Sequence, residues 1–405
     1  MSHQINFTYK ESDWKTPSSF PNLRDAKEIA IDLETKDPNI KTKGPGWPTM
    51  DGNIVGIAVA TDGFNGYYPI AHENGSNMDM KIVLDWVQDI VSGPGDKIFH
   101  NAVYDVGWLR AHGILITQGR IIDTMIAAAI VDENRFSYSL NGLGFDLLGE
   151  TKSEAELKEA ANEWGLDAKQ ELYKLPAKFV GFYAEQDAAL TLKLWQYFKT
   201  EILKQSLTDV FNLEMELLPV LLEMRAVGVR VDLEGAESLK KEFLEKENNI
   251  LLAIKKEAGL DVDIYAARSI AKAFDKLNIK YPLTEKTKEP SFTANWLLNC
   301  EYPIAKLIRE AREVHKFHAT FIDSILKYQH NGRIHAEIHQ LKGDGGGTVS
   351  GRLSYSNPNL QQVPARNKEL GTKIRSLFKP ESGLKWGSFD YSQQEPRLVV
   401  HYAAS

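Results

Sequence analysis

The first half of the chain places strand patterns before helical ones, and this order limits the folds that it can adopt. Three early segments have the composition and length of strands, namely Glu28–Glu34, Asn53–Thr61 and Gly66–Ile70. Helical spacing follows at Met80–Ile90, Ala102–His112, Ile121–Val131 and Pro176–Leu203, with a brief strand at Lys97–His100. Strands followed by helices that pack on them predict an α/β domain over residues 1–205.

The remaining residues predict two further parts. Residues 206–331 are expected to be mostly helical, because Leu239–Glu257 and Ala294–Tyr328 repeat apolar residues at helical spacing around a turn-rich break at Tyr281–Ser291. From residue 332 the pattern changes to a strand-like RIHAEIHQ, a glycine-rich GDGGGTVSGR loop and a predicted strand, Lys385–Tyr391, that ends in an aspartate. We therefore expect a partial α+β part over residues 332–405.

Composition and charge indicate a soluble globular chain with an uneven charge distribution. The net charge is −7, which argues against a surface coated for nucleic acid. It divides into −9 for residues 1–205, −2 for 206–330 and +4 for 331–405. The basic tail is the better candidate to contact phosphates, although ordinary surface variation gives the same pattern.

The cysteine count and the lack of long apolar segments are typical of a cytoplasmic protein. The single cysteine, Cys300, excludes a disulfide within this sequence and suits a reducing compartment. The polar first residues do not resemble a signal peptide, and no stretch approaches 18 uninterrupted apolar residues. We expect a cytoplasmic protein with no membrane partner.

Four carboxylates in the first part could meet at one site. Asp32 and Glu34 end a strand on the same face, Asp105 begins a helix, and Tyr183 and Asp187 share one face of another helix. Such carboxylates repel one another unless divalent cations lie between them, and oxygen ligands suit Mg²⁺ or Mn²⁺. Two ions can activate a water and stabilise a leaving 3′ oxygen, with Tyr183 orienting the water. Taken singly, each fragment is more often a solvated strand end or a surface pair.

The segments IDLET, HNAVYD and YAEQD, with DTM at Asp123–Met125, resemble the proofreading exonuclease of the DnaQ-like family, as found in family A DNA polymerases. The resemblance covers about residues 25–200 and implies a ribonuclease H-like mixed sheet flanked by helices. It implies that Asp32, Glu34, Asp105 and Asp187 bind two Mg²⁺ or Mn²⁺ ions, that Tyr183 positions the water, and that Asn101 and Tyr104 contact the terminal nucleotide. Thr35–Pro38 stands where that family often has a leucine wedge.

The tail contains a second group of polar residues. Arg352, Arg366, Lys373 and Arg375 bracket a loop rich in Asn, Gln and Gly, which is typical of phosphate and minor-groove contacts and also of an irregular surface loop. Asp390, at the end of the last predicted strand, is either a metal ligand or a helix N-cap.

The runs SGRLSYSNPNLQ and DYSQQEPR resemble the palm of family A polymerases of the bacterial polymerase I type, and QQEP is similar to phage members. EAREVHKFHATF resembles the end of their helical thumb. The resemblance implies that Asp390 binds the catalytic Mg²⁺ ions and that Glu395 is the steric gate against a ribose 2′-OH. It also implies DNA contacts by Arg312, Lys316, His339, Gln340, Arg352, Asn359 and Gln361.

The sequence lacks the RxxxKxxxFGxxYG pattern of the fingers and the second metal-binding aspartate of the palm. We therefore expect a 3′→5′ proofreading exonuclease acting on single-stranded DNA ends, with primer-template duplex at thumb and palm. Polymerase activity is expected only with a second chain that supplies the fingers and the rest of the palm, as in a split or truncated polymerase. The alternatives are a DNA-binding replication subunit with an idle nuclease, and an RNA-trimming nuclease, which the thumb and palm disfavour. The apolar Leu398–Tyr402 is expected to lie exposed.

Overall fold

A computed structural model describes residues 12–341, 348, 350–364 and 367–404. The chain divides into two compact units. The first extends to Gly228 and includes His335–Gln362, and the second contains Val229–Ile334 and the residues from Val363 onward.

The first unit is built on a five-stranded mixed sheet in the order β3-β2-β1-β4-β5. Its strands are β1 Glu28–Lys36, β2 Asn53–Thr61, β3 Phe64–Pro69, β4 Asp96–Phe99 and β5 Ile121–Asp123. β2 pairs antiparallel with both β1 and β3, whereas β4 runs parallel to β1 and β5. This mixed sheet confirms the predicted α/β class.

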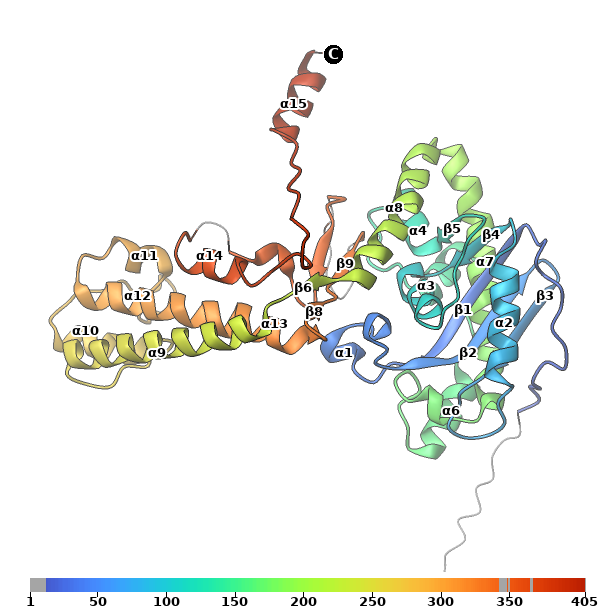
Figure 1. The fold of residues 1–405 in the computed structure, drawn as a ribbon, viewed down its shortest axis with the longest axis horizontal. Helices are drawn as coiled ribbons and strands as arrows, with labels where there is room; N and C mark the ends of the chain where they lie inside the picture. Colours follow the sequence, from blue (N-terminus) through green and yellow to red (C-terminus); the bar gives the residue numbers. More distant parts are fainter. Residues whose placement is uncertain (1–11, 342–347, 349, 365–366, 405) are drawn as a thin grey trace, which may run out of the picture. The chain divides into compact units, whose positions relative to one another are not determined.

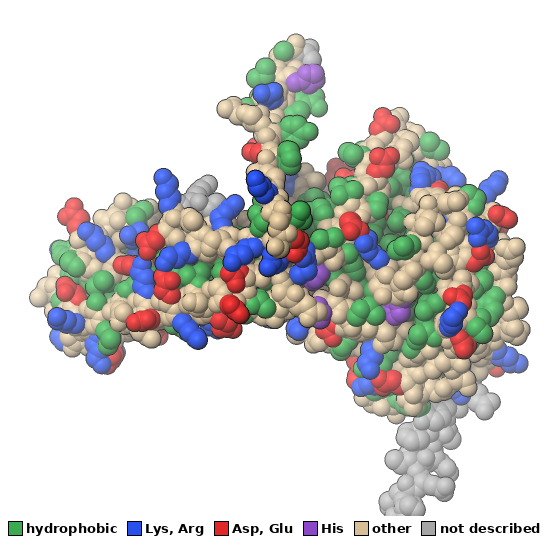
Figure 2. Space-filling view, in the orientation of Figure 1, with side chains coloured by type: hydrophobic (Ala, Val, Ile, Leu, Met, Phe, Trp, Pro, Cys, Tyr) green, Lys and Arg blue, Asp and Glu red, His purple; other side chains and the backbone are tan. Residues whose placement is uncertain are grey.

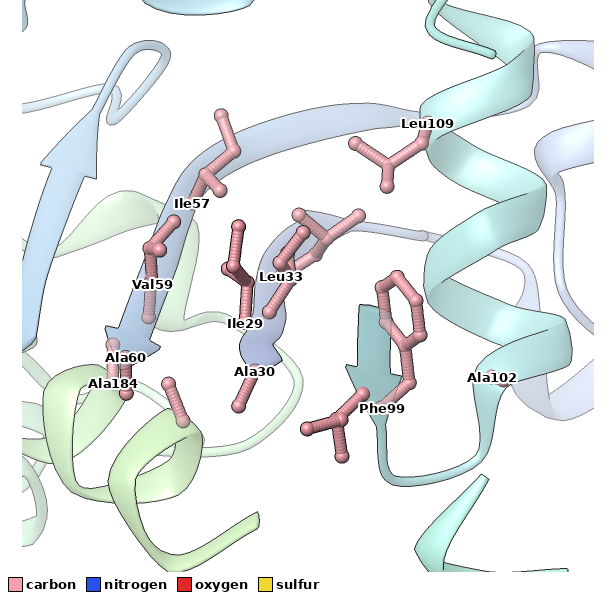
Figure 3. Close-up of a cluster of buried hydrophobic side chains, with 14 of the residues drawn as sticks. Ile29, Ala30, Leu33, Ile57, Val59, Ala60, Phe99, Ala102, Leu109 and Ala184 are labelled. Atoms are coloured by element: carbon pink, nitrogen blue, oxygen red, sulfur yellow. The ribbon is translucent and has the colours of Figure 1, made fainter. Parts of the chain in front are cut away.

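Strand β1 is the middle strand of the sheet, and its apolar residues are covered by the neighbouring strands and helices. Ile29, Ala30 and Ile31 are fully or almost fully buried. Figure 3 shows Ile29, Ala30 and Leu33 among side chains from β2, β4, α3 and α7. The carboxylates of β1 are therefore attached to a rigid, packed strand rather than to a loop.

Helices flank this sheet (Figure 1). They are α1 Ile40–Lys43, α2 Met80–Val91, α3 Ala102–Ala111, α4 Thr124–Val131, α5 Leu140–Leu143, α6 Ala155–Trp164, α7 Gly181–Lys204 and α8 Thr208–Val227, with short turns η1 Trp47–Thr49, η2 Gly144–Leu148, η3 Leu172–Lys174 and η4 Ala177–Phe179. Helix α7 contacts β1, β2, β3 and β4, and α8 packs on α3, α4 and β5. The single helix predicted at Ile121–Val131 is wrong in its first turn, since Ile121–Asp123 pairs with β4 as a strand.

The segment His335–Gln362 adds a small sheet to the first unit. Strands β9 Glu337–His339 and β10 Ser354–Ser356 pair antiparallel, and the short turn η6 Leu360–Gln362 follows. The predicted glycine-rich loop at Gly343–Gly347 and the predicted Arg366 lie outside the described residues.

The second unit is mainly helical. It contains β6 Val229–Arg230, α9 Leu233–Ala258, α10 Ala267–Lys276, α11 Ala294–Asn299, α12 Pro303–Lys316, η5 Phe317–Ile322, α13 Asp323–Tyr328, β7 Gln329–His330, β8 Arg333–Ile334, α14 Leu370–Arg375 and α15 Gln394–Ala404. Helices α9 and α12 pack along each other, and the strands form a small sheet in the order β6-β8-β7.

One sequence prediction for this unit is confirmed and one is corrected. Ala294–Tyr328 is a helical run as predicted, and it divides before α12 because Pro303 starts a new helix and the residue before a proline avoids the helical conformation. Lys385–Tyr391 is not a strand, and no described strand pairs with it. Instead, residues 381–404 are exposed, and Figure 2 shows apolar side chains along this segment. Val400 is 66% exposed and Tyr402 is 75% exposed, as expected for Leu398–Tyr402.

Candidate active site

Three carboxylates of the first unit converge at one place. Asp32 and Glu34 project from β1, and Asp187 projects from α7, which packs on that strand. One carboxylate oxygen from each of the three lies within 4.8 Å of the others. The strand places two of them two residues apart on one face, and the helix supplies the third.

A glycine in the neighbouring strand makes room for a tyrosine ring near Glu34. Gly56 of β2 pairs with Glu34, and a Cβ on Gly56 would lie 2.1 Å from the Tyr67 hydroxyl oxygen. Tyr67 is fully buried, and its hydroxyl contacts His72 Nε2 at 2.7 Å. A glycine is therefore required for the tyrosine ring to pack next to the carboxylates, and no motif in the sequence pointed to it.

Burial and mutual repulsion raise the pKa values of these carboxyls. Burial raises the pKa of Asp32 to about 7, and the charge of Asp187 acts in the same direction. Burial, followed by the charges of Asp32 and Asp187, raises the pKa of Glu34 well above its usual range. Burial also raises the pKa of Asp187, against the opposing effect of Lys152. The group stores electrostatic repulsion that a cation would relieve.

The fourth predicted carboxylate, Asp105, lies beside this group but not within it. Asp105 is 4% exposed in α3, and its Oδ1 accepts a hydrogen bond from the Leu33 backbone N–H at 3.1 Å. Burial and the nearby charge of Asp32 raise its pKa. Asp105 thus fixes the backbone of Leu33, the residue between Asp32 and Glu34, and its carboxylate lies close enough to Asp32 to interact with its charge.

A lysine that sequence analysis missed occupies the edge of the site. Lys152 Nζ lies 2.7 Å from Asp187 Oδ2 and 3.0 Å from the Tyr183 hydroxyl, and its ammonium lies 4.2 Å from the centre of the Tyr183 ring. The side chains of Lys152 and Asp187 are 9% and 7% exposed. Lys152 stands in a loop with no recognisable pattern, so only the fold brings it to the helix.

The donor set fits a divalent cation. Glu34 Oε1 and Asp187 Oδ1 are buried side-chain atoms with no hydrogen-bond partner in the structure. Buried carboxylate oxygens without partners are costly, and hard divalent cations prefer such ligands. These two oxygens, with Asp32, are therefore the atoms through which the group could hold an ion.

The first unit contains a cavity of about 350 Å³, lined in part by the start of α3. Asn101 and Tyr104, the predicted nucleotide contacts, both line it, together with Phe136, Tyr138, His339 and Gln340 among others. Tyr104 contacts Thr35 Oγ1 at 2.5 Å and Asp37 Oδ2 at 3.3 Å through its hydroxyl. Thr35 and Asp37, which stand where a leucine wedge was expected, thus position this tyrosine.

Asp123 shapes the wall of this cavity. It is 1% exposed and accepts hydrogen bonds from the backbone N–H groups of Asn101, Ala102, Met125 and Ile126. These groups belong to the first turns of α3 and α4, which have no partners within their own helices. Asn101 has a left-handed backbone with φ of 72° at the start of α3. One carboxylate therefore caps two helices and fixes the backbone that presents Asn101 and Tyr104.

The predicted DNA contacts outside the carboxylate site differ in their exposure. Arg312 is held inside the second unit, where Nε donates to the Ile264 carbonyl at 2.7 Å and Nη1 to the Phe292 carbonyl at 2.9 Å, while Lys316 is exposed. His339 Nε2 lies 2.7 Å from Ser356 Oγ, and Gln340 Nε2 donates to Glu214 Oε2 at 2.7 Å. Only Lys316 among these four presents its polar group freely exposed to solvent.

The remaining predicted residues lie on exposed segments. Arg352, Asn359 and Gln361 are exposed, with Asn359 Oδ1 accepting from the Gln361 backbone N–H at 3.1 Å. Asp390 and Glu395 are exposed as well, the latter in α15. Among the residues that the structure describes, Asp390 joins no group of potential metal ligands.

The mixed sheet and the carboxylate group shared by its central strand and α7 define an exonuclease-type α/β domain followed by a helical part. Residues 18–203 match the family model of 3′-5′ exonucleases, and residues 233–405 match that of DNA polymerase family A. The chain belongs to DNA polymerase family A, with a 3′-5′ exonuclease domain in its first half.

Relatives include phage and bacterial polymerases. The chain is 38% identical to a DNA-directed DNA polymerase of Pseudomonas phage M6, over 98% of this chain and 62% of that protein. It is 32% identical to DNA polymerase DpoZ of Salmonella phage PMBT28, over 95% and 63%, and 31% identical to DNA polymerase I of Chloroflexus aurantiacus, over 98% and 43%. The chain therefore spans about 40–60% of the length of these relatives.

A solved structure has the same fold. The POL domain of Pol1 from M. smegmatis, in complex with DNA primer-template and dNTP, matches with a TM-score of 0.68 and 22% identity, over 94% of this chain and 60% of that one. Within the described part of the chain, no helix is both long and apolar enough to cross a membrane.

Proposed function

We propose that the first unit hydrolyses DNA from the 3′ end in a reaction that requires divalent cations. The observation that carries this proposal is the convergence of Asp32, Glu34 and Asp187 within 4.8 Å, with two oxygens that have no hydrogen-bond partner among the described residues. Asp32, Glu34, Asp105 and Asp187 would hold the ions, Mg²⁺ or Mn²⁺ by the all-oxygen donor set. Bound there as a pair, the ions would activate a water and stabilise the leaving 3′ oxygen.

The protein's own groups position the reactants in this proposal. Tyr183 directs its hydroxyl to the attacking water, and Lys152 fixes that hydroxyl and Asp187 together. The attacking water releases a proton to solvent as its oxygen forms a bond to phosphorus and the bond to the 3′ oxygen breaks. The departing 3′ oxygen is protonated from solvent.

The cavity lined by Asn101 and Tyr104 is the proposed site of the terminal nucleotide. Its aromatic lining by Tyr104, Phe136 and Tyr138 suits a base that stacks without sequence preference. Single-stranded ends fit this role better than duplex, because a stacked base must leave its partner strand. The substrate would then be a frayed 3′ end of DNA.

The proposal is tested with the intact chain, Mg²⁺ or Mn²⁺, and single-stranded DNA labelled at its 5′ end. We expect stepwise shortening from the 3′ end that EDTA stops and that the Asp32→Ala, Glu34→Ala double variant lacks. An Asp62→Asn variant at an exposed turn serves as the matched control and should trim normally. Binding of DNA without trimming would favour a DNA-binding subunit with an idle nuclease, and preferential trimming of RNA would favour an RNA nuclease.

We further propose that residues 206–331 and 332–405, which follow the exonuclease of residues 1–205 in the sequence, act as thumb and first part of the palm on primer-template DNA. The family match and the exposed Lys316, Arg352, Asn359 and Gln361 support this role. Asp390 would hold the catalytic Mg²⁺ ions and Glu395 would exclude ribose. Nucleotide addition then needs the fingers pattern and the second aspartate, which these 405 residues do not contain.

Primer extension tests this second proposal. The 405-residue chain should extend no primer alone, and should do so when a chain carrying the fingers pattern and the second aspartate is added. An Asp390→Asn variant should abolish the restored extension while trimming by the first unit continues. Extension by the chain alone would contradict the proposal.

A further inference from the structure

A second group of potential metal ligands lies in the second unit and shares no residue with the carboxylate site of the first unit. Glu247 of α9 faces His315, at the end of α12, and His318, in the wide turn η5 that follows. His315 Nδ1 lies 3.0 Å from Glu247 Oε1, and His318 Nε2 lies 2.6 Å from Glu247 Oε2. The three ligand atoms lie within 4.8 Å of one another.

Glu247 breaks the apolar pattern of its own helix. The buried face of α9 runs through Leu239, Phe243, Ile250 and Ile254, and Glu247 stands on that face at the same spacing, 8% exposed. A charged side chain at such a position opposes burial unless a partner compensates it. Departures from a consistent local pattern are expected at functional sites.

The partner helix departs from regular geometry at the same place. Phe317–Ile322 forms a π-helical turn, a rare arrangement that is frequent at functional sites. It begins two residues after His315, and it carries His318. The two imidazole rings lie edge to face with centroids 4.9 Å apart, both next to Glu247. Helix α12 and the π turn thus direct two imidazoles at one buried carboxylate.

The ionic environment of Glu247 leaves a place for a cation. In the described part of the chain, its only ion-pair partners are these two imidazoles, and no lysine or arginine pairs with it. The His315 side chain is 40% exposed, whereas that of His318 is 6% exposed. One side of the group is therefore open to solvent, which provides an entry path and room for a water ligand.

We propose that Glu247, His315 and His318 bind a divalent transition-metal ion. Two imidazole nitrogens and one carboxylate oxygen are the ligand set of three-residue zinc sites with an open fourth position. On binding, His315 Nδ1 and His318 Nε2 present lone pairs to the ion, and any proton on those atoms moves to the other ring nitrogen or to solvent. The ion joins α9 to the end of α12 and fixes the π turn.

The test uses the full chain as the Asp32→Ala, Glu34→Ala, Asp187→Ala variant, which removes the three carboxylates of the first unit that lie close enough together to share an ion. Titration with Zn²⁺ against a chromophoric chelator should give one bound equivalent per chain. Co²⁺ in place of Zn²⁺ should give the visible absorption bands of a four- or five-coordinate site with nitrogen ligands. The midpoint of the thermal unfolding transition of the second unit should rise with Zn²⁺ concentration.

Single substitutions in this background assign the ligands. Glu247→Gln, which keeps the shape of the side chain, and His315→Ala, at the exposed position, should each weaken Zn²⁺ binding more than tenfold and remove the Co²⁺ bands. His330→Ala, a matched control at an exposed histidine outside the group, should change neither. Because His318 is buried, folding of His318→Ala is first checked by circular dichroism.

Two results would overturn the proposal. One is the absence of a saturable equivalent of Zn²⁺ in the background variant. The other is equal binding by the background variant and its Glu247→Gln and His315→Ala derivatives, which would indicate an adventitious ion only. Neither result bears on the exonuclease, whose Mg²⁺-dependent trimming is measured separately with the unmodified chain.

Discussion

At the scale of single residues, the carboxylate site of the first unit holds both excess negative charge and one lysine that offsets it. Asp187 uses Oδ2 to accept a hydrogen bond from Lys152 and leaves Oδ1 without a partner. Lysine and a metal ion can therefore share this carboxylate, each through its own oxygen. The lysine orients the site, and at the same time it repels a cation.

Lys152→Gln separates these two effects. Loss of the ammonium should slow single-turnover trimming about 10²-fold, because Tyr183 and Asp187 lose the group that fixes them. The affinity of the chain for Mn²⁺, measured by calorimetry, should increase, because a like charge has been removed. Lys158→Gln, which removes an exposed lysine paired with Glu154, is the control. A variant that both trims normally and binds Mn²⁺ with unchanged affinity would refute this role.

The raised pKa of Asp32 predicts how stability depends on pH without metal. The folded chain holds the Asp32 proton to about pH 7, whereas the unfolded chain releases it near pH 4. Stability is therefore lost as the pH rises from about 4 to about 7. In EDTA at pH 8, Asp32→Asn should stabilise the first unit by at least about 1 kcal/mol, after allowance for partial solvent access.

Urea unfolding followed at pH 4 and pH 8 measures this difference. The gain from Asp32→Asn should vanish at pH 4, where the carboxyl is protonated in the folded chain. Asp62→Asn, at an exposed turn, should show no comparable change between the two pH values. An Asp32→Asn variant that is less stable than the unmodified chain at pH 8 would show that the carboxylate is not a source of repulsion.

At the scale of elements, Asp123 joins the starts of two helices. Asp123→Ala leaves four backbone donors, two of them in buried hydrogen bonds, without their acceptor and should destabilise the chain by about 2–4 kcal/mol. Asp123→Asn should cost less, about 1–2 kcal/mol, because Oδ1 still accepts while an amide nitrogen faces the Ala102 N–H. Denaturant unfolding gives both values. Asp132→Ala, near the other end of α4, should fall within about 0.5 kcal/mol of the unmodified chain.

Helices and strands were predictable from the sequence where the repeat of apolar residues extended over enough positions to be recognised. Asn53–Thr61 has the predicted bounds of β2, and Met80–Ile90 differs from α2 by one residue. Ile121–Asp123 was missed as a strand, because three apolar residues that run directly into an apolar helix cannot be separated from it by spacing. Its strand character comes from pairing with β4, which is a tertiary interaction.

The candidate site was predictable to the same degree. The three converging carboxylates lie in short motifs that the sequence displays, and the fold brings them together. Lys152 and Gly56 were not predictable, because the first reaches Asp187 from an unpatterned loop and the second matters only through the ring of Tyr67. Both roles depend on which elements pack together, and a single sequence does not state that.

At the scale of the whole chain, two units with separate interiors should unfold separately. Calorimetry should give two transitions, of which Mg²⁺ at about 100-fold above its Kd raises only that of the first unit, by about 5–10 °C, because Mg²⁺ prefers oxygen ligands. The Asp32→Ala, Glu34→Ala variant should lose this rise. A single transition, or an equal rise of both, would contradict the assignment of the carboxylate site to the first unit alone.

The distance in sequence between β1 and α7 has a consequence for the time at which the carboxylate site comes into being during synthesis. Roughly 150 residues separate Glu34 from Asp187, so at about 5–20 residues per second a ribosome needs about 8–30 s to pass from one to the other. Until α7 has emerged, the carboxylates of β1 stay hydrated and far from their partner. A nascent chain therefore carries no assembled site through most of the synthesis of its own first unit.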